Sequence, residues 1–302
     1  MIVVIKPGLL TTVQDSGRWG HQHEGIPVAG PMDPWSHDRA NRLVGNGAGA
    51  ATLEITLAGP RLRVEGPAIA AIVGGAFPVR IDRRELAMGT PFALEPGDEL
   101  EIGRCTLGAR AYLAVRGGVD VPPVLGSRAT HLPSLMGGVQ GRPLVAGDTL
   151  TVGSCGVGPV RWGVTSPVRG GGDAIVRVLP GPDDDAGLEA SLAGLMSARF
   201  QVSPDSNRMG YRLRGAAVDA PPADRLSTPT PMGTIQVPEG GAPIVLMADR
   251  QTTGGYARVA TVISADLGLV GQMKPGDWLT FAACSHDAAL AALRDRMKDV
   301  DA

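Results

Sequence analysis

Two polar stretches carry the residue types best suited to chemistry. Residues 14–18 read QDSGR and residues 249–255 read DRQTTGG, with Asn207 and Arg208 in a further polar loop between them. Carboxylates can move protons, arginines bind carboxylate or phosphate with two parallel hydrogen bonds, and side-chain amides and hydroxyls orient a polar ligand. The candidate catalytic residues are Asp15, Asp249 and Arg250, and the candidate substrate-binding residues are Gln14, Arg18, Asn207, Arg208, Gln251, Thr252, Thr253, Gly254 and Gly255.

The second stretch lies between two apolar segments that predict buried strands, APIVLM (242–247) and ARVATVISA (257–265). A tight hairpin needs only about two turn residues. Burying the polar residues of this longer connection costs free energy unless they bond to one another or to a ligand. We therefore expect either a ligand-binding loop at a barrel mouth or an elaborate turn that satisfies its own backbone. Gly254 and Gly255 would allow a positive φ or a close approach.

Each candidate also has a structural alternative. Any of the Asp–Arg combinations could be an ion pair that braces a barrel loop. Glu54, between Leu53 and Ile55, is predicted to be a paired carboxylate at the edge of the core. His21, His23, Asp33, His37 and Asp38 could form a metal cluster, but a polar loop followed by a solvated helix face is the favoured interpretation, so no metal is predicted.

Composition narrows the classes of partner. The 302 residues carry a formal net charge of −2, which argues against nucleic acid or an anionic membrane as the main partner. The 43 glycines and 25 prolines punctuate apolar runs, as is typical of turn-rich β structure. Three widely spaced cysteines and an N-terminal apolar run too short for a membrane span or a signal sequence predict a cytoplasmic protein with free, buried thiols.

The pattern of short apolar segments predicts a mainly β chain in two domains. We expect one domain at 1–155, a Gly/Pro-rich linker at 156–173 and a second domain at 174–302. Motifs recur in the same order in both: VVIKPG (3–8) matches VRVLPG (176–181), and AGDTLTVG (146–153) matches PGDWLTFA (275–282). Helices are predicted after Asp33 with Pro34 in first position, after Asp185, and after Ser285.

Several familiar motifs are missing from the sequence. There is no GxxxxGK[ST] phosphate loop and no GxGxxG after a predicted strand. There is also no biotinyl acceptor, because Gln272-Met273-Lys274 is followed by Pro275 rather than Met. A GxSxG elbow is absent too, so covalent catalysis by a serine of this type is not expected. Any ATP or biotin would therefore depend on partner subunits or on a site that these motifs do not identify.

Five longer stretches together resemble one family. They are TTVQDSGRWGHQHEGIPVAGPMD (11–33), LVGN to LEITLAGP (43–60), AYLAVRGGVDVPPVLGSRAT (111–130), SPDSNRMGYRL (203–213) and IVLMADRQTTGGYARVATVISADL (244–267). The chain is similar in them to the biotin-dependent carboxyltransferase family, which includes allophanate hydrolase subunit 2, KipA and the C-type subunit of the ATP-dependent 5-oxoprolinase. The resemblance implies two cyclophilin-like β-barrel domains with a few short peripheral helices.

The resemblance implies three alternative functions. The first is a subunit of a 5-oxoprolinase-like complex, which opens the lactam of 5-oxoproline to glutamate with ATP and includes a KipI/PxpB-type partner and a LamB/YcsF-type subunit. The second is carboxyl transfer from carboxybiotin to urea or a related amide, and the third is KipA-like regulation of a kinase inhibitor. The absence of a biotin carboxylase or carrier region favours the first.

In the first function, residues of both barrels would face one shared cleft. Asp15 or Asp249 would be the base, and Arg18, Arg208 or Arg250 would hold a carboxylate or phosphate. Gln14, Gln251, Thr252 and Thr253 would orient the amide.

Overall fold

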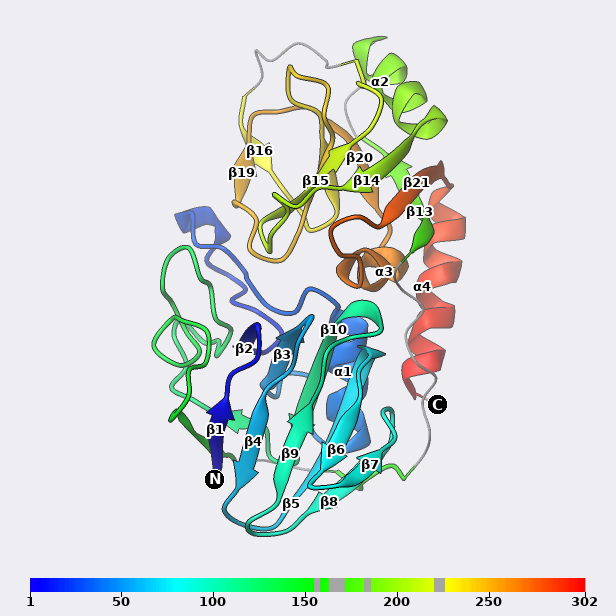
Figure 1. Cartoon of the computed structure of the whole chain (residues 1–302). Coiled ribbons are helices and arrows are strands. Elements are labelled where there is room, and N and C mark those ends of the chain that lie inside the picture. The colour runs from blue at the N-terminus through cyan, green and yellow to red at the C-terminus, as the bar shows by residue number, and fades with distance from the viewer. Residues whose placement is uncertain (155–157, 163–171, 182–185, 220–225, 302) are drawn as a thin grey trace. The chain divides into compact units, whose positions relative to one another are not determined.

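The computed structural model describes residues 1–154, 158–162, 172–181, 186–219 and 226–301. The chain divides into two compact units. Unit 1 comprises Met1–Trp19 and Ala29–Gly170, and unit 2 comprises Gly20–Val28 and Gly171–Ala302. Strands dominate both units and helices are few, so the expected mainly β fold is confirmed (Figure 1).

Unit 1 is built from two antiparallel sheets. The seven-stranded sheet has the order β11 (Val119–Asp120), β12 (Thr149–Val152), β1 (Ile2–Lys6), β4 (Arg61–Val64), β9 (Glu99–Ile102), β6 (Val79–Ile81), β7 (Arg84–Leu86). The five-stranded sheet has the order β2 (Leu10–Gln14), β3 (Thr52–Thr56), β10 (Leu107–Val115), β5 (Ala68–Ala76), β8 (Pro91–Leu94).

Side chains alternate between the two faces of β5 and β10, as the pleat of a strand requires. One set packs in a core shared by both sheets: Ala70, Ile72, Ala111 and Leu113. The other set packs with residues of helix α1 (Pro34–Leu43): Ala71, Val73, Tyr112 and Ala114. The five-stranded sheet is therefore buried on both faces in this region, with α1 as its cover (Figure 1).

Helix α1 begins as its sequence predicts. The carboxylate of Asp33 accepts a hydrogen bond from the Ser36 backbone N–H at 3.1 Å, and Pro34 occupies the first helical turn. The expected solvated face is wrong for His37, which is 2% exposed. Its Nδ1 lies 2.9 Å from the Thr52 hydroxyl on β3, because the helix packs on the sheet through a face that also contains polar side chains.

Unit 2 is a closed seven-stranded barrel. Its strands follow the order β13 (Asp173–Pro180), β20 (Arg258–Val262), β17 (Thr234–Gln236), β18 (Ile244–Leu246), β15 (Gly210–Arg214), β14 (Arg199–Val202), β21 (Trp278–Ala283). A two-stranded sheet, β16 (Thr228–Pro229) with β19 (Thr253–Gly254), lies outside this ring. The helices assigned in unit 2 are η1 (Gln22–Glu24), α2 (Ala186–Ser197), η2 (Ser264–Asp266), α3 (Leu267–Gly271) and α4 (His286–Asp301).

The predicted internal repeat differs between the units in its pairing. β1 runs antiparallel to β12, whereas β13 runs parallel to β21, although the same two sequence motifs define both pairs. The matching motifs therefore form strand pairs of different direction in the two units, because similar strand and turn motifs are compatible with either direction of pairing.

Other sequence expectations have mixed outcomes. The Ser285 hydroxyl accepts a hydrogen bond from the Ala288 N–H at 3.2 Å, so the cap of α4 is confirmed. Cys105 and Cys284 are free but half-buried rather than buried. Asp185, Cys155 and most of the predicted linker 156–173 lie outside the described residues. Within the part of the chain that the structure describes, no helix is both long and apolar enough to cross a membrane.

Candidate functional site

Asp15 holds a loop of unit 1 through both of its carboxylate oxygens. Oδ1 accepts hydrogen bonds from the Ser127 hydroxyl at 2.6 Å and from the Gly17 N–H at 3.0 Å, and Oδ2 accepts from the Arg128 N–H at 2.5 Å. The side chain is buried at the end of β2. The carboxylate that the sequence singled out as a base therefore has protein donors on both oxygens.

Gln14 and Arg18 reach the same loop from either side of Asp15. The Gln14 side-chain N–H donates to the Thr130 carbonyl at 3.0 Å, while Arg18 donates from Nε to the Val124 carbonyl and from Nη2 to the Ala129 carbonyl, both at 2.9 Å. Both side chains are fully buried. We call residues 124–130 the clamped loop, because all three candidates from the QDSGR stretch fix its backbone.

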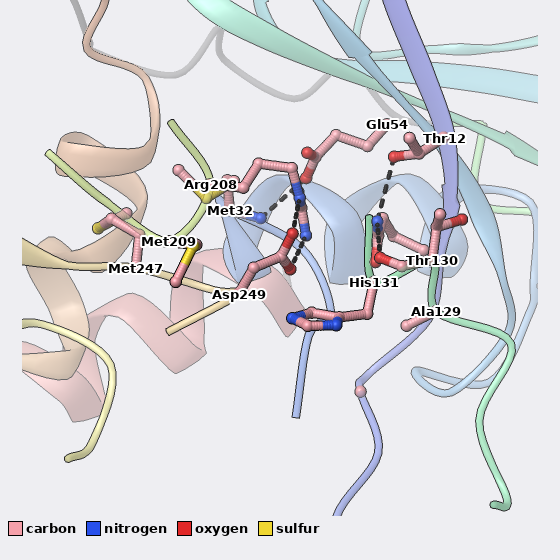
Figure 2. A network of polar contacts seen from close by, with 12 residues as sticks. Thr12, Met32, Glu54, Ala129, Thr130, His131, Arg208, Met209, Met247 and Asp249 are labelled. Carbon is pink, nitrogen blue, oxygen red and sulfur yellow. Dashed lines mark hydrogen bonds and ion pairs between the residues drawn. The ribbon is translucent and has the colours of Figure 1, made fainter. Parts of the chain in front are cut away.

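In unit 2, Arg208 and Asp249 form a buried ion pair. Nε of Arg208 donates to Oδ2 of Asp249, and Nη2 donates to Oδ1, each at 2.9 Å (Figure 2). Both side chains are almost fully removed from solvent. The Asp249 N–H also donates to the Arg208 carbonyl at 2.8 Å, so the pair ties the loop before β15 to the loop after β18.

Arg250 is also directed at the backbone. Its Nε donates to the Thr230 carbonyl at 2.6 Å and its Nη1 donates to the Met247 carbonyl at 3.3 Å. Burial lowers the pKa of Arg250 to about 10, against the opposing influence of the Asp249 charge. At neutral pH the side chain is still a cation, and its described contacts hold the 248–256 loop to the segment around Thr230.

The 248–256 loop connects two strands that are not neighbours. β18 and β20 each pair with β17, which lies between them, so the loop must cross that strand. It is held by the Thr230 hydroxyl, which donates to the Gln251 carbonyl at 2.5 Å, and by the Thr230 N–H, which donates to the Thr252 carbonyl at 3.0 Å. Thr253 and Gly254 form β19, which pairs with Pro229 and Thr228 of β16.

Two other candidates, Asn207 and Gln251, line a cavity of about 220 Å³ in unit 2. Its remaining lining residues come from β15, β17, β18 and the adjoining loops: Met209, Gly210, Arg212, Gln236, Ile244, Leu246 and Tyr256. The pocket thus combines an apolar floor with three side-chain amides and one guanidinium. Asp249, Arg250 and Arg208 do not line it.

Gly254 fits between the amides of this region. A Cβ built on it would lie 2.8 Å from Nε2 of Gln236 and 3.3 Å from Nε2 of Gln251. It is absent from the glycines that adopt a positive φ, so the backbone conformation does not require glycine here. Of the two uses expected for Gly254, the close approach is the one observed.

Glu54 is paired, as expected. Its Oε2 accepts from the Met32 N–H at 2.8 Å and from the Tyr112 hydroxyl at 2.7 Å, and Nε of Arg110 lies 3.8 Å from Oε1 (Figure 2 shows the contact with Met32). Burial and the nearby Glu54 charge raise the pKa of Tyr112 well above its usual value. Among the described residues no group of three or more His, Cys, Asp or Glu is arranged to hold a metal ion.

Sequence reasoning missed Arg212, Gln236 and Tyr256 as pocket residues. For Arg212 a signal was present, since its neighbours Tyr211 and Leu213 are apolar and alternation places an arginine between them on the outer face of the barrel. Gln236 and Tyr256 come together in the pocket because the 248–256 loop crosses β17. Local sequence patterns do not specify this crossing.

Comparison with known proteins gives consistent matches. A family model described as carboxyltransferase domain, subdomain A and B, matches residues 24–283. The C-type subunit of the 5-oxoprolinase of Escherichia coli K12 is 39% identical over 308 residues, and the match covers 99% of this chain and 96% of that protein.

Longer proteins contain a similar region. A urea amidolyase of Lachancea kluyveri is 35% identical, but the match covers 95% of this chain and only 17% of that protein. The crystal structure of the K. lactis urea amidolyase superposes with a TM-score of 0.92 at 32% identity, covering 99% of this chain and 20% of that chain. This chain therefore spans about a fifth of the length of that urea amidolyase.

Proposed function

This chain belongs to the carboxyltransferase domain family, and from that premise we propose that it is the C-type subunit of a 5-oxoprolinase-like complex. The observation that carries the proposal is sequence identity. The C-type subunit of the E. coli 5-oxoprolinase is 39% identical to this chain over 308 residues, whereas the L. kluyveri urea amidolyase is 35% identical over 311 residues.

The proposed reaction hydrolyses two bonds together. One water opens the lactam of 5-oxoproline to give glutamate, and a second water converts ATP to ADP and phosphate, so the two hydrolyses balance as a sum. In this chain the contacts of Asp15, Asp249 and Arg250 support a positioning role for each, since Asp15 and Arg250 bond to loop backbone and Asp249 forms a buried ion pair with Arg208. Their direct participation in proton transfer stays a prediction.

Two cavities lined by described residues do not fit ATP. A triphosphate is usually cradled by backbone N–H groups and several cations. The cavity of about 530 Å³ in unit 1 is lined by one Arg or Lys side chain, Arg116, and by the acidic side chain of Glu95. Nη1 of Arg116 already donates to the Val44 carbonyl at 3.0 Å. The cavity of about 220 Å³ in unit 2 is smaller than typical pockets for drug-sized ligands, roughly 300–1,000 Å³.

We propose that ATP binds to another subunit of the complex. A KipI/PxpB-type subunit is the proposed partner, with a LamB/YcsF-type subunit as the third component. A cytoplasmic location is part of the proposal, since the free thiols of Cys105 and Cys284 suit a reducing compartment.

The test is reconstitution. The chain is co-expressed with KipI/PxpB-type and LamB/YcsF-type subunits, the complex is purified, and glutamate and ADP are measured with 5-oxoproline and ATP as substrates. We expect both products in equal amounts, and no product from the complex when ATP is omitted. An assembled, folded complex that forms no glutamate would refute the proposal.

Carboxyl transfer is the second candidate, because the urea amidolyase relatives share this region at 32–35% identity. In that case biotin would be carried by a partner protein, and labelled bicarbonate would enter urea or a related amide only in its presence. The same purified complex can be assayed for this incorporation. If neither reaction occurs but the partner subunit still binds, a KipA-like regulatory function takes the place of both.

A further inference from the structure

The pocket of unit 2 lies on the outer face of the barrel wall. Tyr211, Leu213, Val245 and Ile235 are buried, and the residues that alternate with them line the pocket: Gly210, Arg212, Ile244, Leu246 and Gln236. The adjoining loops contribute Asn207, Met209, Gln251 and Tyr256. A concave site formed by a rigid sheet and two loops is a favourable place for a small ligand.

Arg212 brings a positive charge to this pocket without a fixed partner. In the described parts of the chain its guanidinium makes neither a hydrogen bond nor an ion pair, and its backbone N–H donates to the Ser206 hydroxyl at 3.1 Å. The nearby carboxylate of Asp205 is paired with Arg214 at 3.1 Å and receives only a weaker influence from the Arg212 charge. The guanidinium thus has donors suited to a carboxylate with two parallel hydrogen bonds.

The three amides supply complementary polar groups. The Gln236 side chain is buried and donates from Nε2 to the Tyr256 carbonyl at 3.2 Å, which fixes its orientation. The side-chain amide of Gln251 makes no hydrogen bond within the residues that the structure describes, and Asn207 uses only its Oδ1, which accepts from the Met209 N–H at 2.8 Å. Amide groups of this kind pair well with the N–H and C=O of another amide.

We propose that this pocket binds the substrate of the complex, a small molecule with one carboxylate and one amide, and that Arg212 binds the carboxylate. This inference rests on the proposed function, for which 5-oxoproline is such a molecule. Gln251 and Asn207 orient the lactam, and the apolar floor of Gly210, Ile244 and Leu246 contacts its methylene groups.

Calorimetric titration of the purified full chain with L-5-oxoproline and with 2-pyrrolidinone tests the assignment, since 2-pyrrolidinone has the same lactam without the carboxylate. Arg212→Gln is expected to weaken binding of 5-oxoproline by about tenfold or more, because a charge-assisted hydrogen bond is lost. The same variant is expected to leave the weaker binding of 2-pyrrolidinone unchanged. Arg214→Gln, on the same strand and face but outside the pocket, is the matched control and is expected to bind both compounds as the unmodified chain does.

The outcomes separate this inference from the proposed function. If the unmodified chain does not bind 5-oxoproline, or if Arg212→Gln and Arg214→Gln bind it equally, the pocket assignment is overturned even when the complex makes glutamate. If binding depends on Arg212 but the complex makes no glutamate, the binding site stands and the proposed reaction fails. A selective rise of KM for 5-oxoproline in an Arg212→Gln complex would support both.

Discussion

Asp249 and Arg208 combine the residue types of an active site with the contacts of a structural pair. Each side chain is buried and bonded to the other through two hydrogen bonds. Replacing one member of such a pair leaves the other charge buried without its partner, which typically costs far more than an exposed pair is worth.

We therefore predict that Asp249→Asn lowers the free energy of unfolding by about 3 kcal/mol, since one partner of a buried pair is removed. Urea unfolding followed by circular dichroism measures the change. The matched control is Asp205→Asn, which breaks the exposed Arg214–Asp205 pair and is expected to unfold close to the unmodified chain. Equal stability of Asp249→Asn and the unmodified chain would contradict a bracing role and return Asp249 to the group of catalytic candidates.

His37 provides a prediction on pH. Burial lowers its pKa below the usual 6.5, although the Ala48 carbonyl and the charges of Asp15, Asp38 and Glu54 act in the opposite direction. The unfolded chain therefore binds a proton at this position at a higher pH than the folded chain, so stability falls as the pH drops below about 6.5. The slope from a single group is at most about 1.4 kcal/mol per pH unit.

His37→Gln, which keeps a polar side chain facing Thr52, is expected to remove this part of the pH dependence. The measurement is the difference in unfolding free energy between the variant and the unmodified chain at pH 8 and at pH 5. Asp148 contributes to the pH dependence of stability below pH 5 and so outside this interval, because the hydrogen bond from Arg142 lowers its pKa from 3.8. A difference that is constant from pH 8 to pH 5 would show that His37 does not titrate differently on folding.

At the residue scale the sequence predicted polar groups that must be bonded, but not their partners. The cost of burial required Asp15, Asp249 and Arg250 to be paired, and each is. Two of the partners of Asp15, Ser127 and Arg128, lie more than a hundred positions away along the chain. Local spacing carries no information on such contacts, which also explains why Gln236 was missed in the pocket.

At the scale of elements, the end of β2 and the clamped loop (residues 124–130) act as one unit. Gln14, Asp15 and Arg18 donate to or accept from its backbone, and the side chain of Ser127 also bonds to Asp15. A loop with this many long-range hydrogen bonds to one buried strand end should open rarely. The main consequence of losing Asp15 should therefore be a looser loop.

We predict that Asp15→Ala speeds tryptic cleavage after Arg128, whose backbone N–H is held by the Asp15 carboxylate. Limited proteolysis followed by mass spectrometry measures the rate, and hydrogen exchange of residues 124–130 provides a second readout. Ser16→Ala is the control, because Ser16 is exposed and its hydroxyl donates to the Ala48 carbonyl outside this loop. Loss of activity in the Asp15→Ala complex with unchanged cleavage and exchange would instead support Asp15 as the base.

Elements with complete local signals were predicted best. Helix α1 has its cap and its proline in the sequence, and it begins at Pro34 as expected. The strands before and after the 248–256 loop were also predicted, as β18 and β20. The insertion of β17 between them was not, because the order of strands in a barrel depends on pairing between distant segments.

At the scale of the whole molecule, the two units use similar motifs in different pairings, one as two sheets and the other as a closed barrel. Neither the 530 Å³ cavity of unit 1 nor the 220 Å³ pocket of unit 2 has the several cations and backbone donors of a triphosphate site. The unit 2 pocket does have groups that suit a small carboxylate. Substrate binding and ATP binding are therefore expected to reside in different subunits.

Thermal unfolding of the isolated chain tests this division. A ligand that binds only the folded chain adds about 2.7 kcal/mol of stability at one hundred times its Kd, enough to raise Tm by several degrees. We predict that 5-oxoproline raises the Tm in a concentration-dependent manner, whereas ATP with magnesium leaves it unchanged at millimolar concentration. Glycine at the same concentration controls for non-specific effects of a small zwitterion. A rise of Tm with ATP would place the nucleotide site on this chain and overturn the division of roles between subunits.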